Sequence, residues 1–176
     1  STPTISITPS ASNSVVLIEF TAIFSAGGSS NGCDAAIADS SNNLITETES
    51  AKLKEILDRL EFSPNYNYNE TKIIRYQKWF QKDKLYFCNL WKTKFKRWEA
   101  YTYFKELTEF QNLITKRIKT LGLENLGINI PEFNSCLINK YLEDHYIRAH
   151  RDTDRAFGKE PLIAGVSFGS PAEIIF

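Results

Sequence analysis

His150 and Asp152 are separated by a single residue, and this pair has the clearest chemical content in the sequence. Alternate residues of an extended segment point to the same side, so the imidazole and the carboxylate can bind one Fe(II) from neighbouring positions. A site of this kind takes a second histidine. The other histidine of the chain, His145, lies too close to His150 along the sequence to be the expected third ligand. The pair therefore predicts part of an iron site.

Asn139 and Tyr141 precede this pair and are also separated by one residue. On a strand they share a face, so an amide and a phenol can both reach one ligand. A His-x-Asp pair alone occurs by chance in many surface loops, so its assignment to an iron site depends on the surrounding residues. Asn139 as a turn or bulge residue and Tyr141 as a core aromatic are the ordinary alternatives.

The stretch from Phe133 to Gly169 closely resembles the AlkB family of 2-oxoglutarate- and Fe(II)-dependent dioxygenases. A weaker upstream block, Arg75 to Phe80 followed by Leu85 to Phe87, resembles the segment that forms the nucleotide-recognition side in that family. The resemblance implies that His150 and Asp152 bind Fe(II). It further implies that the Asn-x-Tyr pair, Asn139 and Tyr141, contacts 2-oxoglutarate.

The resemblance also implies a substrate pocket. Asp154 matches an acidic position near the target base, where it can accept a hydrogen bond from an exocyclic amino group. Trp79, Phe80 and Tyr86 match the aromatic side of the pocket, where a flipped base would be stacked. A helix cap or a solvated acid is the alternative for Asp154, and the sequence does not decide which ring stacks.

The family pattern continues beyond Phe176, where this sequence ends. The resemblance places a distal metal histidine and a 2-oxoglutarate-binding arginine in that further part, and no arginine follows Arg155 here. A guanidinium is the group expected to pair with a carboxylate. The sequence therefore predicts a C-terminally incomplete domain, with the activity of this chain in doubt.

The composition describes a globular chain of 176 residues, with 42% hydrophobic and 13% aromatic residues and a formal net charge of zero. Basic residues are not in excess, so a contact with nucleic acid would depend on a local patch of basic side chains. The segment 92–98 mixes lysines with Phe95 and Trp98, although a solvated face with inward-pointing aromatics explains it too. Three dispersed cysteines suggest neither a zinc site nor disulfides, which favours a reducing compartment.

Residues 1–43 are rich in Ser, Thr, Asn and Gly, and we expect a flexible tail followed by the AlkB-like domain from residue 44 to 176. The apolar run from Val15 to Phe24 predicts a strand, which we interpret as an isolated one that pairs with a sheet edge. This run contains a glutamate and is too short to span a membrane. No signal peptide is expected, and the nucleus or cytoplasm is the expected location.

Helical spacing of apolar residues follows Thr48, and a second helix is expected from Phe104 to Leu121, ended by Gly122. Strands are expected from Thr71 to Trp79, from Leu85 to Leu90 and in short pieces after Cys136. This order predicts an α+β fold in which helices back one sheet of a barrel or jelly roll. The resemblance implies a double-stranded β-helix, which is the jelly roll of that family.

Three functions follow from these observations. The first is oxidative dealkylation of alkylated bases in DNA or RNA, with Fe(II) and 2-oxoglutarate as cofactors and no membrane partner. The second is a protein hydroxylase on the same scaffold, which would not need Trp79 or Tyr86. The third is a catalytically dead fragment that binds nucleic acid or another partner. The oligomeric state is not predicted.

Overall fold

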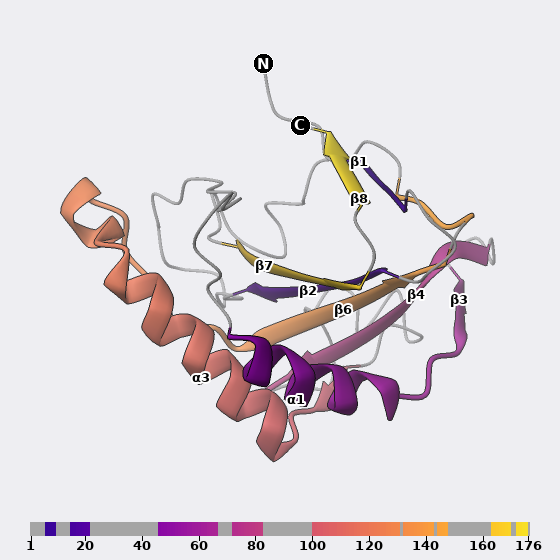
Figure 1. Ribbon diagram of the computed structural model, residues 1–176, viewed down its shortest axis with the longest axis horizontal. Coiled ribbons are helices and arrows are strands. Elements are labelled where there is room, and N and C mark those ends of the chain that lie inside the picture. The colour runs from indigo at the N-terminus through magenta and orange to yellow at the C-terminus, as the bar shows by residue number, and fades with distance from the viewer. Residues whose placement is uncertain are drawn as a thin grey trace, which may run out of the picture.

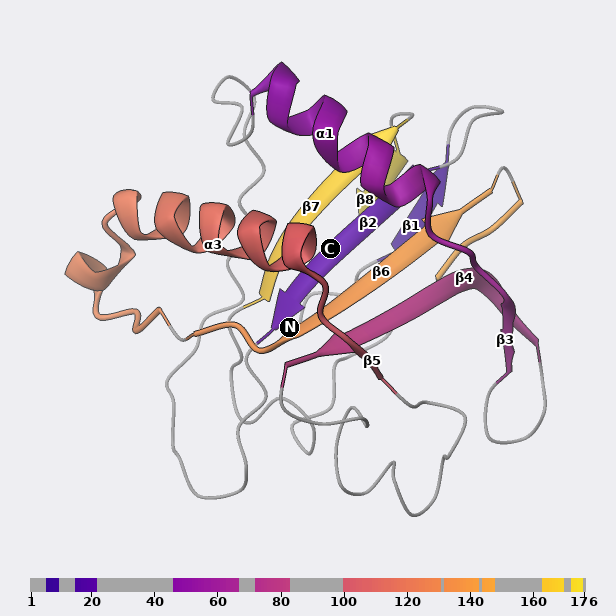
Figure 2. The ribbon, with the colours of Figure 1, turned by 90° about the horizontal axis from the view of Figure 1, so that it is seen from below.

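Two helices cover one face of a six-stranded sheet in the computed structural model of this chain (Figure 1). The helices are α1 (Glu47–Asp58) and α3 (Lys105–Thr120). Figure 2 shows both helices in front of the sheet when the molecule is seen from below. The structure describes residues 6–9, 15–21, 46–66, 72–82, 100–130, 132–142, 144–147, 163–169 and 172–175.

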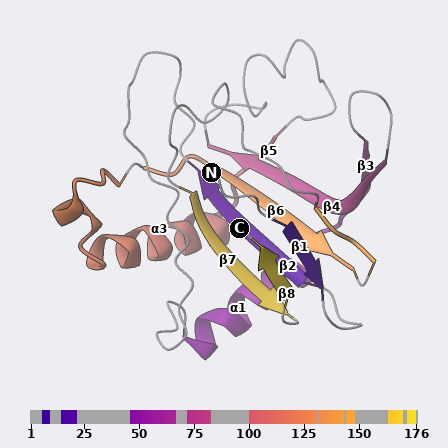
Figure 3. The same ribbon diagram turned by 90° about the horizontal axis from the view of Figure 1, so that it is seen from above.

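The six-stranded sheet is mostly antiparallel, with the order β3-β4-β6-β2-β7 and with β5 paired in parallel to β4. Its strands are β2 (Val15–Thr21), β3 (Pro64–Tyr66), β4 (Lys72–Gln81), β5 (Tyr101–Thr102), β6 (Ser135–Tyr141) and β7 (Ile163–Gly169). A separate two-stranded sheet joins β1 (Ser6–Pro9) to β8 (Ala172–Ile175). It lies on the side of the larger sheet opposite the helices (Figures 1 and 3).

The expected helix after Thr48 is confirmed, and it begins slightly earlier than the pattern suggested. Thr46 is the N-cap, and its side chain accepts from the Glu49 backbone N–H while the Glu49 carboxylate accepts from the Thr46 backbone N–H. This reciprocal capping box satisfies two donors that a helix start leaves without intrahelical partners. The local sequence therefore fixes the beginning of α1.

The second expected helix is also confirmed by α3. Its apolar stripe packs on the sheet, and Leu107, Ile114 and Ile118 are each at most 3% exposed. After the C-cap Leu121, Gly122 adopts a left-handed backbone with φ +68°, which glycine enters without a steric penalty. A short 3-10 helix, η2 (Leu123–Leu126), then leads toward β6.

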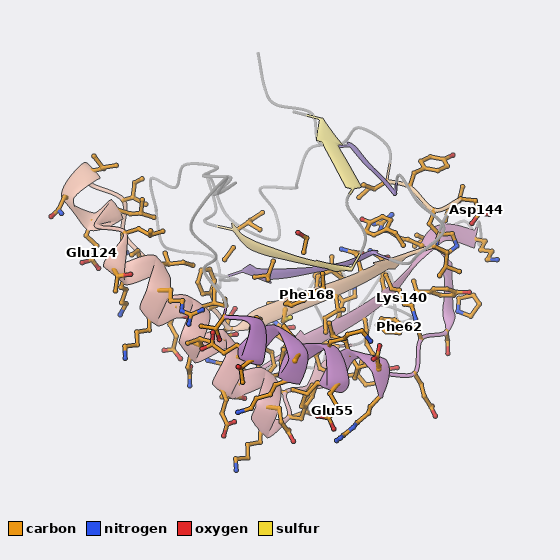
Figure 4. The ribbon with its side chains drawn as sticks, viewed as in Figure 1. Glu55, Phe62, Glu124, Lys140, Asp144 and Phe168 are labelled. Carbon is orange, nitrogen blue, oxygen red and sulfur yellow. The ribbon has the colours of Figure 1, made fainter. Side chains whose placement is uncertain are left out.

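The hydrophobic core lies between the two helices and the sheet. Leu53 of α1, Phe110 of α3 and Ile138 of β6 belong to one buried cluster. Phe168 of β7, labelled in Figure 4, also packs against this cluster. Its ring centroid lies 6.4 Å from that of Phe110. Burial of these side chains is the main stabilising term that attaches the helices to the sheet.

One buried polar group helps to hold the start of β6. Gln111 of α3 is 1% exposed, accepts a hydrogen bond from the Tyr103 hydroxyl at 2.7 Å and donates to the Phe133 carbonyl at 2.6 Å. Burial, together with Cys136, raises the pKa of Tyr103, so its hydroxyl stays protonated and donates. This network links α3 to the residues that lead into β6.

Two strands lie in the segment that the sequence assigned to a flexible tail. β1 and β2 fall within residues 1–43, and β2 pairs on both sides, with β6 and with β7. The expected strand in the run from Val15 is therefore present, but it occupies the interior of the sheet and not its edge. The expected boundary between residues 43 and 44 stays a prediction.

The expected mixed fold of helices backing one sheet is confirmed for the described residues. β4 matches the strand expected from Thr71 to Trp79 and continues to Gln81. The strand expected from Leu85 to Leu90 lies outside the described residues. In the part of the chain that the structure describes, no helix combines the length and apolar character that crossing a membrane requires.

Candidate functional site: a buried polar face of the sheet

Asn139 and Tyr141 lie on the same face of β6, as their spacing predicted. Cys136 and Ile138 of the same strand belong to the core cluster between the sheet and the helices. Asn139 and Tyr141 occupy the positions in between and therefore point to the other face of the sheet. We call the side of the six-stranded sheet away from α1 and α3 the far face. Asn139 is 1% exposed and Tyr141 is 0% exposed. Both polar side chains are therefore held inside the protein.

Asn139 receives two hydrogen bonds from the neighbouring strand β4. Gln77 lies directly opposite in the antiparallel register, and its Nε2 donates to Asn139 Oδ1 at 3.0 Å. Arg75 Nε donates to the same oxygen at 3.1 Å. With Oδ1 accepting twice, the orientation of the amide is defined, and its NH2 group is the donor side.

The far face carries most of the buried polar residues that the structure describes. Gln77 and Gln81 of β4 and Ser135 and Asn139 of β6 are each at most 6% exposed. Buried polar groups are costly unless they are hydrogen-bonded, so such a face is unusual for a purely structural core. Guanidinium, amide, hydroxyl and phenol groups are suited to binding an anionic or carbonyl-rich ligand.

Trp79 and Phe80 do not share a face, although the sequence grouped them in one pocket. Trp79 alternates with Gln77 and Gln81 on the far face and is 8% exposed. Phe80 points to the helices, where its ring packs 5.6 Å from Phe104 and belongs to the core cluster. Neighbouring residues of a strand point to opposite faces, so the structure brings Trp79, and not Phe80, to the side of Asn139 and Tyr141.

Four other predicted site residues, His150, Asp152, Asp154 and Tyr86, lie outside the described residues, as does the basic segment 92–98. His145 is described, and its ring contacts Tyr76 edge-on with the centroids 5.3 Å apart. Tyr76 alternates with Phe80 and so faces away from Asn139. No cluster of three or more His, Cys, Asp or Glu side chains that could hold a metal occurs in the described ranges.

Sequence reasoning missed Arg75 and Gln77 as partners of Asn139. Both residues belong to the upstream block that resembles the AlkB family, but nothing in the sequence assigned either of them a role in the site. The signal that could have found them is the alternation of Arg75, Gln77 and Trp79 within one expected strand, which places all three on one face. The pairing of that strand with β6 is not encoded in the local pattern.

Comparison with known proteins adds one positive finding. The family model described as the 2OG-Fe(II) oxygenase superfamily matches residues 40–176. The matched range contains β4 and β6, which carry the far face, and also the His150 and Asp152 pair. No curated protein and no solved structure gives a significant match.

Proposed function

Because the chain belongs to the 2OG-Fe(II) oxygenase superfamily, we propose that it removes alkyl groups oxidatively from nucleic-acid bases. The family establishes a dioxygenase-type reaction with Fe(II) and 2-oxoglutarate as the cofactors. The base as substrate is our proposal. The observation that carries it is the position of Trp79 on the same buried face as Asn139 and Tyr141.

The far face fits 2-oxoglutarate by the chemistry of its donors. Asn139 offers the NH2 of an amide whose oxygen is already engaged, and Tyr141 offers a phenol two residues along the same strand. Both are hydrogen-bond donors, which is what carboxylate oxygens require. In this proposal Asn139 and Tyr141 bind and orient the cosubstrate from the wall of the sheet.

His150 and Asp152 are the proposed Fe(II) ligands, through one imidazole nitrogen and one carboxylate oxygen. When bound, Fe(II) and 2-oxoglutarate would activate O2, so that one oxygen atom hydroxylates the alkyl carbon attached to a base nitrogen and the other is used in converting 2-oxoglutarate to succinate and CO2. The hydroxylated carbon then leaves as an aldehyde and restores the base. The protein contributes ligand geometry, a water-poor pocket and selection of the base.

Trp79 is proposed to contact the target base, with Tyr86 and Asp154 as further substrate contacts. An indole offers a large flat surface, and enzymes that act on a base stack it against such side chains after extruding it from the helix. Trp79 lies on β4, the strand that also carries Arg75 and Gln77 toward Asn139. A base stacked there would be adjacent to the proposed cosubstrate site.

The double-stranded β-helix also belongs to this proposal. The two-stranded sheet of β1 and β8 lies across from the far face, whereas the helices cover the other side (Figure 3). Two sheets facing each other around a polar interior are the general arrangement of a jelly roll. We propose that the far face is the inner wall of such a barrel.

The first experiment is an anaerobic titration of Fe(II) into the full chain in the presence of 2-oxoglutarate. The weak visible charge-transfer band of the chelate is the measured signal. We expect a band in the native protein and its loss in the His150→Ala variant. A band of equal strength in both proteins would show that His150 is not an iron ligand. No band in either protein would favour the catalytically dead fragment for this chain.

Turnover of methylated oligonucleotides, measured as released formaldehyde, tests the substrate class. We expect Trp79→Ala to lower the rate about tenfold or more, because a base–aromatic stack contributes about 1–3 kcal/mol. Tyr101→Ala is the matched control, since Tyr101 is 55% exposed and lies on β5. Equal rates in the two variants would argue against base stacking on Trp79, whereas no formaldehyde from the native protein would favour the protein hydroxylase.

A further inference from the structure

One interior strand of the six-stranded sheet comes from outside the range that matches the superfamily. The match covers residues 40–176, which we call the family domain, whereas β2 spans Val15–Thr21. Even so, β2 lies between β6 and β7, two strands of the family domain (Figure 3). All seven residues of β2 are paired with both neighbours. The N-terminal segment therefore supplies a strand that no described part of the family domain supplies.

The other strand that precedes the family domain behaves in the same way. β1 pairs antiparallel with β8, which belongs to the family domain. In the described sheets, β1 and β2 do not pair with each other. Both described strands before residue 40 thus complete sheets of the family domain and do not form a unit of their own.

β2 joins β7 to the rest of the six-stranded sheet. Among the described strands, β7 pairs with β2 and with no other. Neighbouring strands lie about 4.8 Å apart, so β6 and β7 flank a slot about 10 Å wide, which is the space of one extended chain. Without an occupant, both sides of this slot would expose backbone N–H and C=O groups that need partners.

We propose that β2 is a donor strand, and that the slot between β6 and β7 binds an extended, mainly apolar peptide that β2 of the same chain provides. The sequence VVLIEFT is rich in the β-branched and aromatic residues that favour strands. In this mode of recognition, main-chain hydrogen bonds supply the affinity. The inference depends on the family match and the strand pairing, and not on the substrate proposed above.

The donor strand also supports the strand that carries the proposed cosubstrate contacts. In the register of β2 against β6, Leu17 is the partner of Asn139 and Val15 is the partner of Tyr141. The backbone at Asn139 is therefore paired on both sides, by β2 and by β4. A segment outside the family domain thus helps to position the far face.

Strand exchange in the full chain tests this proposal. Residues 22–45 connect β2 to the N-cap of α1, and a recognition sequence for a specific protease is inserted between Asn31 and Gly32. The cut chain and the uncut chain are each unfolded in urea. They are then refolded by dilution with an excess of a fluorescent peptide of residues 12–24. Protein-bound fluorescence after size-exclusion chromatography is the measured signal.

We expect the cut chain to incorporate the labelled peptide and the uncut chain to incorporate at least about tenfold less. The reason is that a tethered β2 competes at an effective concentration in the millimolar range. The Ile18→Pro peptide is the matched control, because proline lacks the N–H and is excluded from the interior of a sheet. It should not be incorporated, whereas an Ile18→Val peptide should be incorporated like the native one.

Three results would overturn the proposal. The first is equal incorporation of the native and Ile18→Pro peptides, since binding would then not use the paired backbone of a strand. The second is a cut chain that takes up no native peptide. The third is a cut chain that releases its N-terminal piece and keeps the circular dichroism spectrum and melting temperature of the uncut protein, because the sheet would then need no donor strand.

Discussion

At the scale of single residues, the far face depends on a small number of directed hydrogen bonds. Asn139 is 1% exposed, and its Oδ1 is the shared acceptor for Arg75 and Gln77. An apolar residue at this position would bury two donors without that acceptor. Because unsatisfied buried groups cost more than a satisfied pair contributes, the Asn139 side chain contributes to stability as well as to the proposed ligand binding.

We predict that Asn139→Leu lowers the free energy of unfolding by about 1–3 kcal/mol, the cost of leaving buried donors without their partner. Urea denaturation followed by tryptophan fluorescence measures this change. Ser135→Ala on the same face is the control, because Ser135 Oγ makes a long 3.4 Å bond to the Phe80 carbonyl. If Ser135→Ala lowered the free energy of unfolding as much as Asn139→Leu, this prediction would be contradicted.

At the scale of elements, the two helices are connected to each other as well as to the sheet. Glu49, in the first turn of α1, caps its own helix and also accepts hydrogen bonds from Arg117 Nη2 of α3 at 2.7 and 2.9 Å. The backbone hydrogen bond from Thr46, followed by the bonds from Arg117 and the Thr46 hydroxyl, lowers the pKa of Glu49 from 4.5 to about 2. The ionised form is therefore favoured in the folded state.

This lowered pKa predicts a pH dependence of stability. Glu49 stabilises the fold fully above pH 4.5, and the contribution is lost as the pH falls toward about 2, because the unfolded state then binds the proton more readily. At pH 6 we expect the native protein to have a higher melting temperature than Glu49→Gln. This difference in melting temperature should decrease as the pH falls from 4.5 to 2. Thermal unfolding by circular dichroism at several pH values measures it.

Glu55→Gln is the matched control for this pH series. It removes a carboxylate from the same helix, but Glu55 pairs with Arg59 on an exposed surface, where ion pairs contribute little. We expect its melting temperature to follow the native protein at every pH. A gap for Glu49→Gln that is constant from pH 6 to pH 2 would mean that Glu49 acts through packing and not through its charge.

At the scale of the whole molecule, the sheet separates two environments of opposite character. Its helix side, which α1 and α3 cover in Figure 2, holds the apolar core cluster. Its far face is polar in β4 and β6. Stability therefore resides mainly on the first side and the proposed chemistry on the second. Such a division allows the polar face to vary in function without loss of the core.

A pair of leucine substitutions tests this division. Leu107→Ala on α3 should lower the free energy of unfolding by about 2–5 kcal/mol, since a 1% exposed side chain leaves a cavity against the sheet. Leu126→Ala in η2, where the side chain is 76% exposed, should change it by less than about 0.5 kcal/mol. Urea denaturation measures both, and similar values would contradict the assigned core.

The sequence alone determined the local elements and the family. Periodic apolar residues predict α1 and α3 because helix formation depends on contacts within a few residues, whereas the N-cap Thr46 lies two residues before the expected start at Thr48. The one-residue spacing of Asn139 and Tyr141 placed them on one face for the same reason. The resemblance that those motifs carried agrees with the superfamily that matches residues 40–176.

Only the tertiary structure decided which strands lie side by side. Strand pairing joins residues far apart in the chain, and a shift of one residue in register exchanges the two faces of a strand. The register of β4 against β6 therefore brought Arg75 and Gln77 to Asn139 and turned Phe80 into the core. The same non-local pairing placed β2 inside the sheet, in a segment whose composition had indicated a tail.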